Sequence, residues 1–481
     1  MDKEEVLKIT KDLPPIIGIA PNAFSRIILA DFCPEYSIVC FKYRGETDII
    51  ARDIEVFCVE KEDPGTSISK MNAQELLVHP KVQEYIKSKK DPHLLIYKPT
   101  KGVEAISYEM GWKVIGNSSS VKYKIENKYE FRQLLKKAGI EAITGETILY
   151  DDLDKNKYGE MVEKYGNKLV FQIAEMTSGG GTGTAFINSE EDFKNFKNKF
   201  DIKREKLLSI NKVNVTRFME GTPTSISACA TKFGVVTGYI QTQILDIPEV
   251  RLMSDGSGLF SGHDFSFGNY SGELNEQAKC MARSFGEYIY KNLSYKGIFG
   301  LDLITDIGSG KVYPIECNPR FTAALPMYSL MTTSINKVPP IEFFHLMAQL
   351  GIKENFDFQM VNSGLKERIL FSHISLTPKG IYEMKLNLPA GVYSLASENL
   401  GLRYERPGAF LWDLKNNSEF LMADSIPRFG AKVAQDAPTL FRLIFPRSIA
   451  TSSFSIHPEI GQLITNLSLL LRKDQKPPEG D

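Results

Sequence analysis

The sequence has few of the residues that build disulfide frameworks or zinc sites. Its 481 residues include six cysteines and six histidines, and the cysteines form no CxxC pair and no regular spacing. A disulfide-rich domain or a structural zinc site needs a recurring pattern of cysteine or histidine. We therefore interpret the cysteines as reduced thiols of a cytoplasmic protein.

A large net charge and a long apolar run are missing as well. Lysine and arginine number 58 against 59 aspartate and glutamate residues, so the formal net charge is only −1. Such a balance is not typical of a surface that binds nucleic acid or anionic membranes. No apolar stretch approaches the roughly 20 residues of a membrane span. The charged N-terminus, MDKEEVLKITKDLPP, is unlike a signal peptide. We expect a soluble protein with neither nucleic-acid nor membrane partners.

Three regions with different patterns follow one another, and the length allows two to four domains. Over residues 1–120, apolar strands such as YSIVCFKY alternate with helical segments, which predicts a parallel α/β domain. Residues 121–345 combine amphipathic helices with strands. Residues 346–481 become mostly β in pattern and end in a helix, EIGQLITNLSLLL, and a polar tail predicted to be disordered. We predict a multidomain α/β and α+β protein with a mostly β C-terminal domain.

The most specific motif is the stretch KVYPIECNPRFTAALP. Its strand-like alternation places Glu316, Asn318 and Arg320 on one face, because every second residue of a strand points the same way. The preceding segment, GLDLITDIGSGK, is a strand followed by a glycine-containing turn. A hairpin centred near Ser309 places Asp302 opposite or nearly opposite Glu316.

Two opposed carboxylates predict a cation between them. Directly opposed residues have Cβ atoms roughly 5 Å apart, and two carboxylates at that distance repel unless a cation intervenes. Asp302, Glu316 and Asn318 offer the oxygen ligands that Mg²⁺ prefers, with substrate phosphates completing the shell. Arg320 is suited to a bidentate grip on a phosphoryl or carboxylate group. The alternative interpretation is a solvated strand face with a fortuitous row of charges.

A glycine-rich hairpin supports the phosphate-binding interpretation. The segment FQIAEMTSGGGTGTAFI places glycines and threonines between two predicted strands. Glycine lets backbone N–H groups approach an oxyanion without obstruction by a Cβ. No Gly-Lys-Ser/Thr follows, so it is not a P-loop. We interpret the segment as a flap over phosphates; a mobile surface turn is the alternative. The flap comprises Gly179, Gly180, Gly181, Thr182, Gly183 and Thr184.

The segment 245–269 is predicted to be a long loop on the acceptor side of the site. It is rich in glycine and serine, and long structured loops are often functional. Arg251 and His263 are its candidate catalytic residues. Lys122 is interpreted as a solvated lysine, and Cys317 as a thiol that faces away from Glu316.

The order of these elements resembles the ATP-grasp superfamily, and within it the ATP-dependent peptide and amino-acid ligases. The resemblance covers roughly residues 115–330, and the α/β unit before it is similar to the family's usual N-terminal domain. It implies that residues 121–345 form two lobes with a hinge near 216–221. GLDLITD and IECNPR resemble the family's metal-binding pair, which implies Mg²⁺, or alternatively Mn²⁺, at Asp302, Glu316 and Asn318.

The resemblance also implies how ATP is held. Lys128 stands where the family has a lysine for the phosphates. TRFM is similar to the inter-lobe segment that pairs with adenine through the backbone of Arg217 and Met219. The residues expected at the nucleotide are Lys128, Gln172, Gly179, Gly180, Gly181, Thr182, Gly183, Arg217, Phe218, Met219 and Glu220.

Two positions depart from the family's pattern. The strand before the flap usually carries a second phosphate-binding lysine, and here it carries Gln172, which keeps a hydrogen-bond donor without the charge. Many members have a ribose-binding glutamate shortly after the hinge, whereas this chain has EGTPTSIS. Glu220 is only a neighbour of that position.

The resemblance implies an ADP-forming carboxylate–amine ligase. Such an enzyme phosphorylates a carboxylate with ATP, and an amine then displaces phosphate from the acyl phosphate. Its partners are small-molecule acids and amines, and a homodimer is a candidate assembly. Two alternatives stay open. One is a bicarbonate-using carboxylase or carbamoyl-phosphate-type enzyme. The other is a nucleotide-binding regulatory protein with weak turnover, which the departures at Gln172 and the ribose position motivate.

Overall fold

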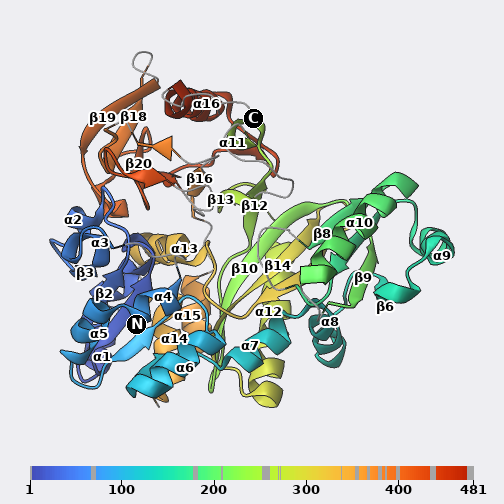
Figure 1. Cartoon of the computed structure of the whole chain (residues 1–481), viewed down its shortest axis with the longest axis horizontal. Coiled ribbons are helices and arrows are strands. Elements are labelled where there is room, and N and C mark those ends of the chain that lie inside the picture. Colours follow the sequence, from blue (N-terminus) through green and yellow to red (C-terminus); the bar gives the residue numbers. More distant parts are fainter. Residues whose placement is uncertain are drawn as a thin grey trace.

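Three large β-sheets organise the chain (Figure 1). The structure is a computed structural model, and it describes residues 3–66, 72–176, 183–206, 210–251, 260–268, 270, 272–336, 338–352, 357–365, 369–376, 382–384, 387–396, 401–433 and 440–473. Within these ranges no helix combines the length and apolarity needed to cross a bilayer.

The first sheet is parallel and has the order β3-β2-β1-β4-β5. β1 and β2 are buried along their whole length, which explains why they are apolar runs and not alternating strands. The predicted N-terminal α/β arrangement is confirmed. The strands are β1 (Ile16–Ala20), β2 (Tyr36–Cys40), β3 (Glu55–Cys58), β4 (His93–Leu95) and β5 (Lys113–Ile115). The helices are α1 (Lys3–Thr10), η1 (Phe24–Asp31), α2 (Thr47–Ile50), α3 (Val59–Glu62), α4 (Ala73–Val78), α5 (Pro80–Lys87) and α6 (Lys101–Met110).

A four-stranded antiparallel sheet forms a separate lobe, on the right of Figure 1. Its order is β6-β9-β7-β8, and Gln172 on β7 lies opposite Thr184 on β8, as the glycine-rich hairpin predicted. Phe193, Phe196 and Phe200 recur on one face of α10 and fill its core. The strands are β6 (Gly145–Leu149), β7 (Leu169–Ile173), β8 (Thr184–Ile187) and β9 (Lys212–Arg217). The nearby helices are α7 (Ser119–Glu126), α8 (Lys128–Lys137), η2 (Tyr150–Asp152), α9 (Lys155–Tyr165) and α10 (Glu190–Lys206).

The largest sheet is antiparallel along its path β15-β14-β10-β12-β13-β16-β22-β20-β18-β19, with β11 paired to β10. Side chains alternate between the two faces of the sheet along β10 and β14, so the two faces differ in composition. The apolar face of β10 and β14 packs against α12, with Ala278 and Phe285 in that core. The opposite face carries Ser225 and Asp302 toward one end, whereas Cys229 and Ile298 toward the other end are part of another hydrophobic core. The elements are β10 (Thr222–Thr231), β11 (Gly234–Thr237), β12 (Gln241–Leu245), α11 (Pro248–Arg251), β13 (Phe260–Asp264), α12 (Gly272–Leu293), β14 (Gly297–Asp306) and β15 (Lys311–Asn318).

The C-terminal strands continue this same sheet. The predicted boundary at residue 345 therefore falls in a helix between strands of one continuous sheet, and the domain limits stay a proposal. The strands are β16 (Ser372–Leu376), β17 (Tyr382–Glu383), β18 (Gly391–Leu395), β19 (Leu402–Pro407), β20 (Glu419–Ala423), β21 (Lys432–Val433), β22 (Phe441–Phe445), β23 (Ala450–Ser452) and β24 (Ser455–Ile456). The helices are α13 (Leu325–Met331), η3 (Thr332–Asn336), α14 (Ile341–Leu350), α15 (Phe358–Gly364), η5 (Leu411–Asp413) and the predicted C-terminal helix α16 (Pro458–Lys473).

The prediction of one long loop over 245–269 is wrong. Within its described residues, α11 ends at Arg251 and β13 pairs with β12 on one side and β16 on the other. Gly262 permits this pairing, because a Cβ there would lie 2.0 Å from the carbonyl oxygen of His373. The glycine that favoured a loop in the sequence is instead needed for close strand packing.

Candidate active site

Asp302 and Glu316 lie directly opposite each other on β14 and β15, as predicted. The register of this hairpin shifts between Asp302 and Leu303, so β15 carries one extra residue at that point. Such a bulge re-aims side chains. The Asn318 amide Nδ2 donates to Asp302 Oδ2 at 2.9 Å. Cys317 points to the opposite face, into the core beneath α12, which confirms that prediction.

The electrostatics of this pair suit a divalent cation. Burial, and secondly the neighbouring Glu316 carboxylate, raise the pKa of Asp302 to about 7. A bound cation would remove both the repulsion and the cost of ionising Asp302. In the described ranges, no cluster of three or more His, Cys, Asp or Glu side chains is arranged to hold a metal. The protein thus offers two carboxylates, which suits Mg²⁺ that keeps phosphate and water ligands.

Asn318 is oriented by Arg320. Its Oδ1 accepts from Arg320 Nη2 at 2.8 Å while its Nδ2 faces Asp302. A carbonyl oxygen has two lone pairs, so Asn318 can ligate a cation only through the one that Arg320 leaves free.

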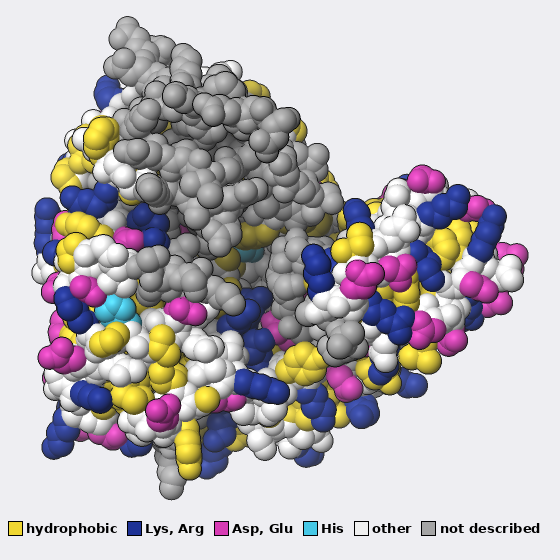
Figure 2. Space-filling view, in the orientation of Figure 1, with side chains coloured by type: hydrophobic (Ala, Val, Ile, Leu, Met, Phe, Trp, Pro, Cys, Tyr) yellow, Lys and Arg dark blue, Asp and Glu magenta, His cyan; other side chains and the backbone are white. Residues whose placement is uncertain are grey.

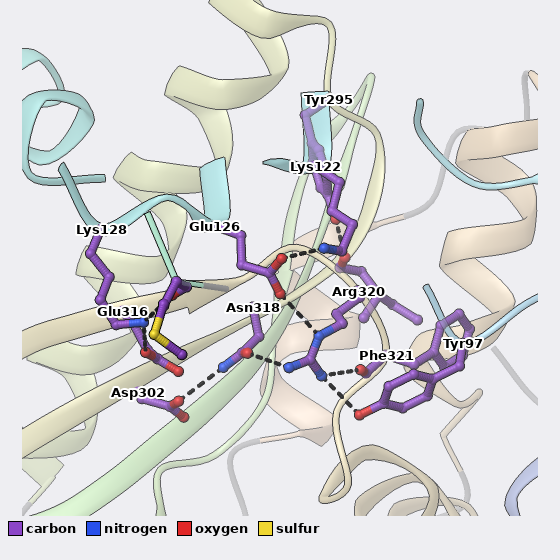
Figure 3. A network of polar contacts seen from close by, with 12 residues as sticks. Tyr97, Lys122, Glu126, Lys128, Tyr295, Asp302, Glu316, Asn318, Arg320 and Phe321 are labelled. Carbon is purple, nitrogen blue, oxygen red and sulfur yellow. Dashed lines mark hydrogen bonds and ion pairs between the residues drawn. The ribbon is translucent and has the colours of Figure 1, made fainter. Parts of the chain in front are cut away.

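A network of polar contacts holds Arg320 in place (Figure 3). Its Nε donates to Glu126 Oε1 at 3.3 Å, and its Nη1 donates to the Tyr97 hydroxyl at 2.8 Å and to the Phe321 carbonyl at 3.0 Å. With the bond to Asn318, four of the five N–H groups of the guanidinium are in use. Arg320 is therefore a rigid member of the site.

Sequence reasoning missed the supporting residues. Lys122 was predicted to be solvated, and this is wrong: it is buried and forms an ion pair with Glu126, one turn further along α7. The spacing of four residues signalled the pair, but nothing in the segment signalled that Glu126 also accepts from Arg320. From β12, Gln243 Nε2 donates to Asp302 Oδ1 at 3.0 Å, and no motif indicated this.

Lys128 joins the metal side to the nucleotide side. Its Nζ lies 3.2 Å from Glu316 Oε2 and donates to the Met176 carbonyl at 3.0 Å, at the end of β7. Gln172 Nε2 donates to Thr184 Oγ1 across the flap strands at 3.4 Å. Gly183 accepts from the Ile173 amide at 2.8 Å. Gly179, Gly180, Gly181 and Thr182 lie outside the described residues.

The predicted hinge begins where β9 ends. The Arg217 amide donates to the Thr144 carbonyl at 3.1 Å, and the Phe218 amide donates to the Lys168 carbonyl at 2.9 Å. The amides of Arg217 and Phe218 thus bond to backbone at the ends of neighbouring strands. The backbone groups that the predicted pairing with adenine requires are the Arg217 carbonyl and the Met219 amide. Arg217 Nε also donates to Met219 Sδ at 3.0 Å. Glu220 is exposed and forms an ion pair with Lys168 at 3.4 Å.

His263 does not lie on a loop but inside the large sheet. It is buried on β13, between Ser225 of β10 and His373 of β16. Burial lowers the pKa of His263 to about 3, so the imidazole is neutral. Arg251 is the last residue of α11, and its side chain lies outside the described part of the chain.

Figure 2 shows this face of the molecule hollowed between the lobe that carries β6–β9 and the rest of the chain. Lysine and arginine side chains gather at the bottom of the hollow. The polar face of β14 and β15 and the flap strands thus belong to two separate lobes, as in a site that encloses a ligand between them.

Residues 125–324 match the family model described as an ATP-grasp domain. These residues form an ATP-grasp domain, and the resemblance to the ATP-grasp superfamily is confirmed over this range. One similar curated protein is the [butirosin acyl-carrier protein]–L-glutamate ligase of Niallia circulans, 22% identical over 255 residues, which are 53% of this chain and 56% of that protein.

A second curated relative is the arginine-specific carbamoyl phosphate synthase large chain of Halalkalibacterium halodurans. It is 21% identical over 367 residues, 71% of this chain and 30% of that protein. The chain therefore spans about half the length, or less, of these two relatives. Among solved structures, the biotin carboxylase domain of Hydrogenobacter thermophilus 2-oxoglutarate carboxylase, in complex with MgADP, ADP and bicarbonate, is similar in fold. Its TM-score is 0.60 at 14% identity, and the match covers 90% of this chain and 86% of that one.

Proposed function

We propose that the protein is an ATP-dependent ligase that joins a carboxylate to an amine through an acyl phosphate and releases ADP and phosphate. The observation that carries the proposal is the pair Asp302 and Glu316, directly opposed on a polar sheet face with Lys128 3.2 Å from Glu316. This arrangement gathers anion-binding and cation-binding groups at one point, which suits phosphoryl transfer.

The proposed roles follow from the charges. Asp302 and Glu316, with one lone pair of Asn318, would hold Mg²⁺ or Mn²⁺, which would supply charge neutralisation at the phosphates. Lys128, which pairs with Glu316 at 3.2 Å, would bind an ATP phosphate. Arg320, held by Glu126 and Asn318, stabilises charge on the transferred phosphoryl group without reorganising.

The nucleotide lies between the two lobes in this proposal. The Arg217 carbonyl and the Met219 amide pair with adenine, next to Phe218 and Glu220. Gln172 and the flap cover the phosphates with uncharged donors. Lys128 is the candidate to compensate for the missing lysine charge at 172, because its Nζ donates to the Met176 carbonyl, three residues after the strand that carries Gln172.

The comparisons support two carboxylate substrates. One relative is named as an L-glutamate ligase, and another as a carbamoyl phosphate synthase. A bicarbonate-using enzyme is therefore the second candidate function, favoured by the solved structure with bicarbonate. Identity at this level shows the fold alone, so the substrates are a matter for experiment. A homodimer stays a prediction, which light scattering of the purified chain measures directly.

An ADP-release screen tests the proposal. The chain is incubated with ATP and Mg²⁺ and with pairs of amino acids, small acids and bicarbonate, and each product is identified by mass spectrometry. We expect ADP formation that depends on both a carboxylate and an amine. Oxygen-18 in the reacting carboxylate should appear in the released phosphate. AMP formation, or a product without label in the phosphate, contradicts the acyl-phosphate route; ADP formation with bicarbonate alone supports the second candidate.

A further inference from the structure

The polar face that carries Asp302 extends across the sheet into the C-terminal strands. Asp302 pairs with Ser225, and Ser225 pairs with Gln241. Gln243, two residues further on β12, shares this face and pairs with His263. Directly opposed residues of antiparallel strands point to the same side. His263 therefore faces the same side of the sheet as the metal-binding pair, although three strands, β14, β10 and β12, lie between it and Glu316.

Two further pairings lengthen the row. His263 on β13 pairs with His373 on β16. Ser375, two residues after His373, pairs with Arg442 on β22. All four of these side chains are buried. The row thus ends at a buried arginine contributed by the C-terminal part of the chain.

A chain of hydrogen bonds assigns the protons along this row. Gln241 Nε2 donates to Ser225 Oγ at 2.9 Å, and Ser225 Oγ lies 3.5 Å from His263 Nε2. His263 Nδ1 lies 3.2 Å from His373 Nε2. Burial lowers the pKa of both imidazoles, so each carries one proton. If the serine hydroxyl donates to His263, that ring donates to His373, and His373 is left with an N–H at Nδ1.

Three buried polar atoms at neighbouring positions of β16 and β22 have no partner among the described residues: His373 Nδ1, Ser375 Oγ and Arg442 Nε. The other nitrogens of Arg442 are used, since Nη2 lies 3.0 Å from Asp424 Oδ2 and Nη1 donates to the Ala323 carbonyl at 3.4 Å. Buried polar groups are almost always hydrogen-bonded, so three neighbouring exceptions that can all donate call for an acceptor.

We propose that His373, Ser375 and Arg442 bind a carboxylate group of a substrate, an inference that rests on the proposed ligase function for the identity of that substrate. Two carboxylate oxygens satisfy the three donors. Asp424 already neutralises the guanidinium of Arg442, so a bound monoanion adds one buried charge and a phosphate dianion adds two. The monoanion therefore fits better, because each uncompensated buried charge is costly.

The bound carboxylate is not the reacting one. His373 lies four strand spacings from Asp302 across the sheet, and each spacing is roughly 4.8 Å. A single carboxylate cannot touch both points. The anchored group therefore belongs either to the amine substrate, as in an amino acid, or to a second carboxylate of the acid. In both cases the C-terminal strands select the substrate while the ATP-grasp strands activate it.

Imidazole nitrogen NMR of the full chain tests the site without turnover. The chain has six histidines, and His373→Gln and His263→Gln assign the two signals of interest. Acetate is the probe and acetamide its neutral counterpart. We expect acetate to shift both signals saturably and acetamide to leave them unchanged. Equal shifts by the two probes, or none by acetate, overturn the proposal and indicate that water alone fills the position.

Two variants at Arg442 keep the test informative. Arg442→Lys preserves the charge beside Asp424 and removes the Nε donor. Where that variant is unstable, the double variant Asp424→Asn, Arg442→Gln removes both charges; Asn suits position 424, whose φ is 62°. Either change should weaken acetate binding by about tenfold or more, as for the loss of a charge-assisted hydrogen bond. Arg403→Gln, at an exposed ion pair with Glu405, is the control and should bind acetate normally.

Kinetics with the substrates found in the ADP-release screen identify the owner of the carboxylate. Arg442→Lys should raise KM for one substrate by about tenfold or more, without a comparable change in kcat or in KM for ATP. If the anchored carboxylate belongs to the amine substrate, replacing it by an amide should abolish the KM difference between Arg442→Lys and the wild type. If it belongs to the acid substrate, the same replacement on the acid should abolish that difference. Unchanged KM values for both substrates overturn the proposal. A screen that finds no substrates counts against the ligase function, while the NMR titration still decides the site.

Discussion

Replacing Glu316 by glutamine tests whether the opposed carboxylates bind a cation. The change removes one charge at nearly constant shape. It abolishes one proposed metal ligand, removes the repulsion on Asp302, and breaks the ion pair with Lys128. We expect ADP production to be lost while the fold is kept.

The magnitude for stability follows from Asp302. Its pKa rises from 3.8 to about 7, which corresponds to at most about 4 kcal/mol of destabilisation above pH 7. Burial causes the larger part and Glu316 the smaller, so relief of the repulsion should be worth about 1–2 kcal/mol. The lost ion pair with Lys128 offsets part of this gain, because that lysine is buried and is left without its charged partner. The net gain without metal is about 1 kcal/mol or less.

The sign of the pH dependence is part of the prediction. Because the folded-state pKa of Asp302 is raised, this group costs nothing below pH 3.8, and its cost grows as the pH rises to about 7. The gain of Glu316→Gln should therefore be present at pH 8 and absent at pH 5. Thermal denaturation at the two pH values measures it.

The assay combines denaturation with turnover. MgADP should raise the Tm of the wild type and leave that of Glu316→Gln unchanged. Glu141→Gln is the matched control. Glu141 also pairs with a lysine, at 3.8 Å, but that lysine, Lys311, lies at the exposed end of the hairpin. If Glu316→Gln keeps near-native ADP production at ordinary Mg²⁺, the metal assignment is wrong.

Three further changes test other parts of the structure. The double variant Gly180→Ala, Gly181→Ala should raise KM for ATP and lower kcat, because Cβ atoms hold the flap off the phosphates. Gly159→Ala is the control and should have no such effect, because a Cβ at Gly159 meets nothing within 4 Å. If the flap variant has the same KM and kcat as this control, the flap is a plain surface turn. Lys128→Gln should raise KM for ATP by about tenfold, since a charge-assisted contact is lost; an unchanged KM removes Lys128 from the nucleotide site. Asp264→Asn should lower stability by about 2–4 kcal/mol, because its buried carboxylate accepts six hydrogen bonds that an amide cannot all accept. Denaturant unfolding measures this loss, and a loss of less than about 0.5 kcal/mol would falsify it.

The local pattern of the sequence determined most of the candidate site. Alternation along one strand places Glu316, Asn318 and Arg320 on a common face, because the period of a strand is independent of its neighbours. A short hairpin then brings Asp302 near that face. The apolar runs of β1 and β2 likewise predict a buried parallel sheet, since a strand covered on both sides has no polar face.

Tertiary structure alone decided the register and the partners. A bulge in β15 sets Glu316, and not its neighbour Ile315, against Asp302. Lys122 is buried and pairs with Glu126, which also accepts a hydrogen bond from Arg320, far along the chain. The segment that contains Lys122 and Glu126 does not indicate this partner. The glycine-rich composition around His263 predicts a loop, but in the structure strands on both sides bond to its backbone. One of these strands contains His373, which is 110 residues away in the sequence. Contacts of this kind depend on how distant segments pack, and spacing within one segment contains no information about them.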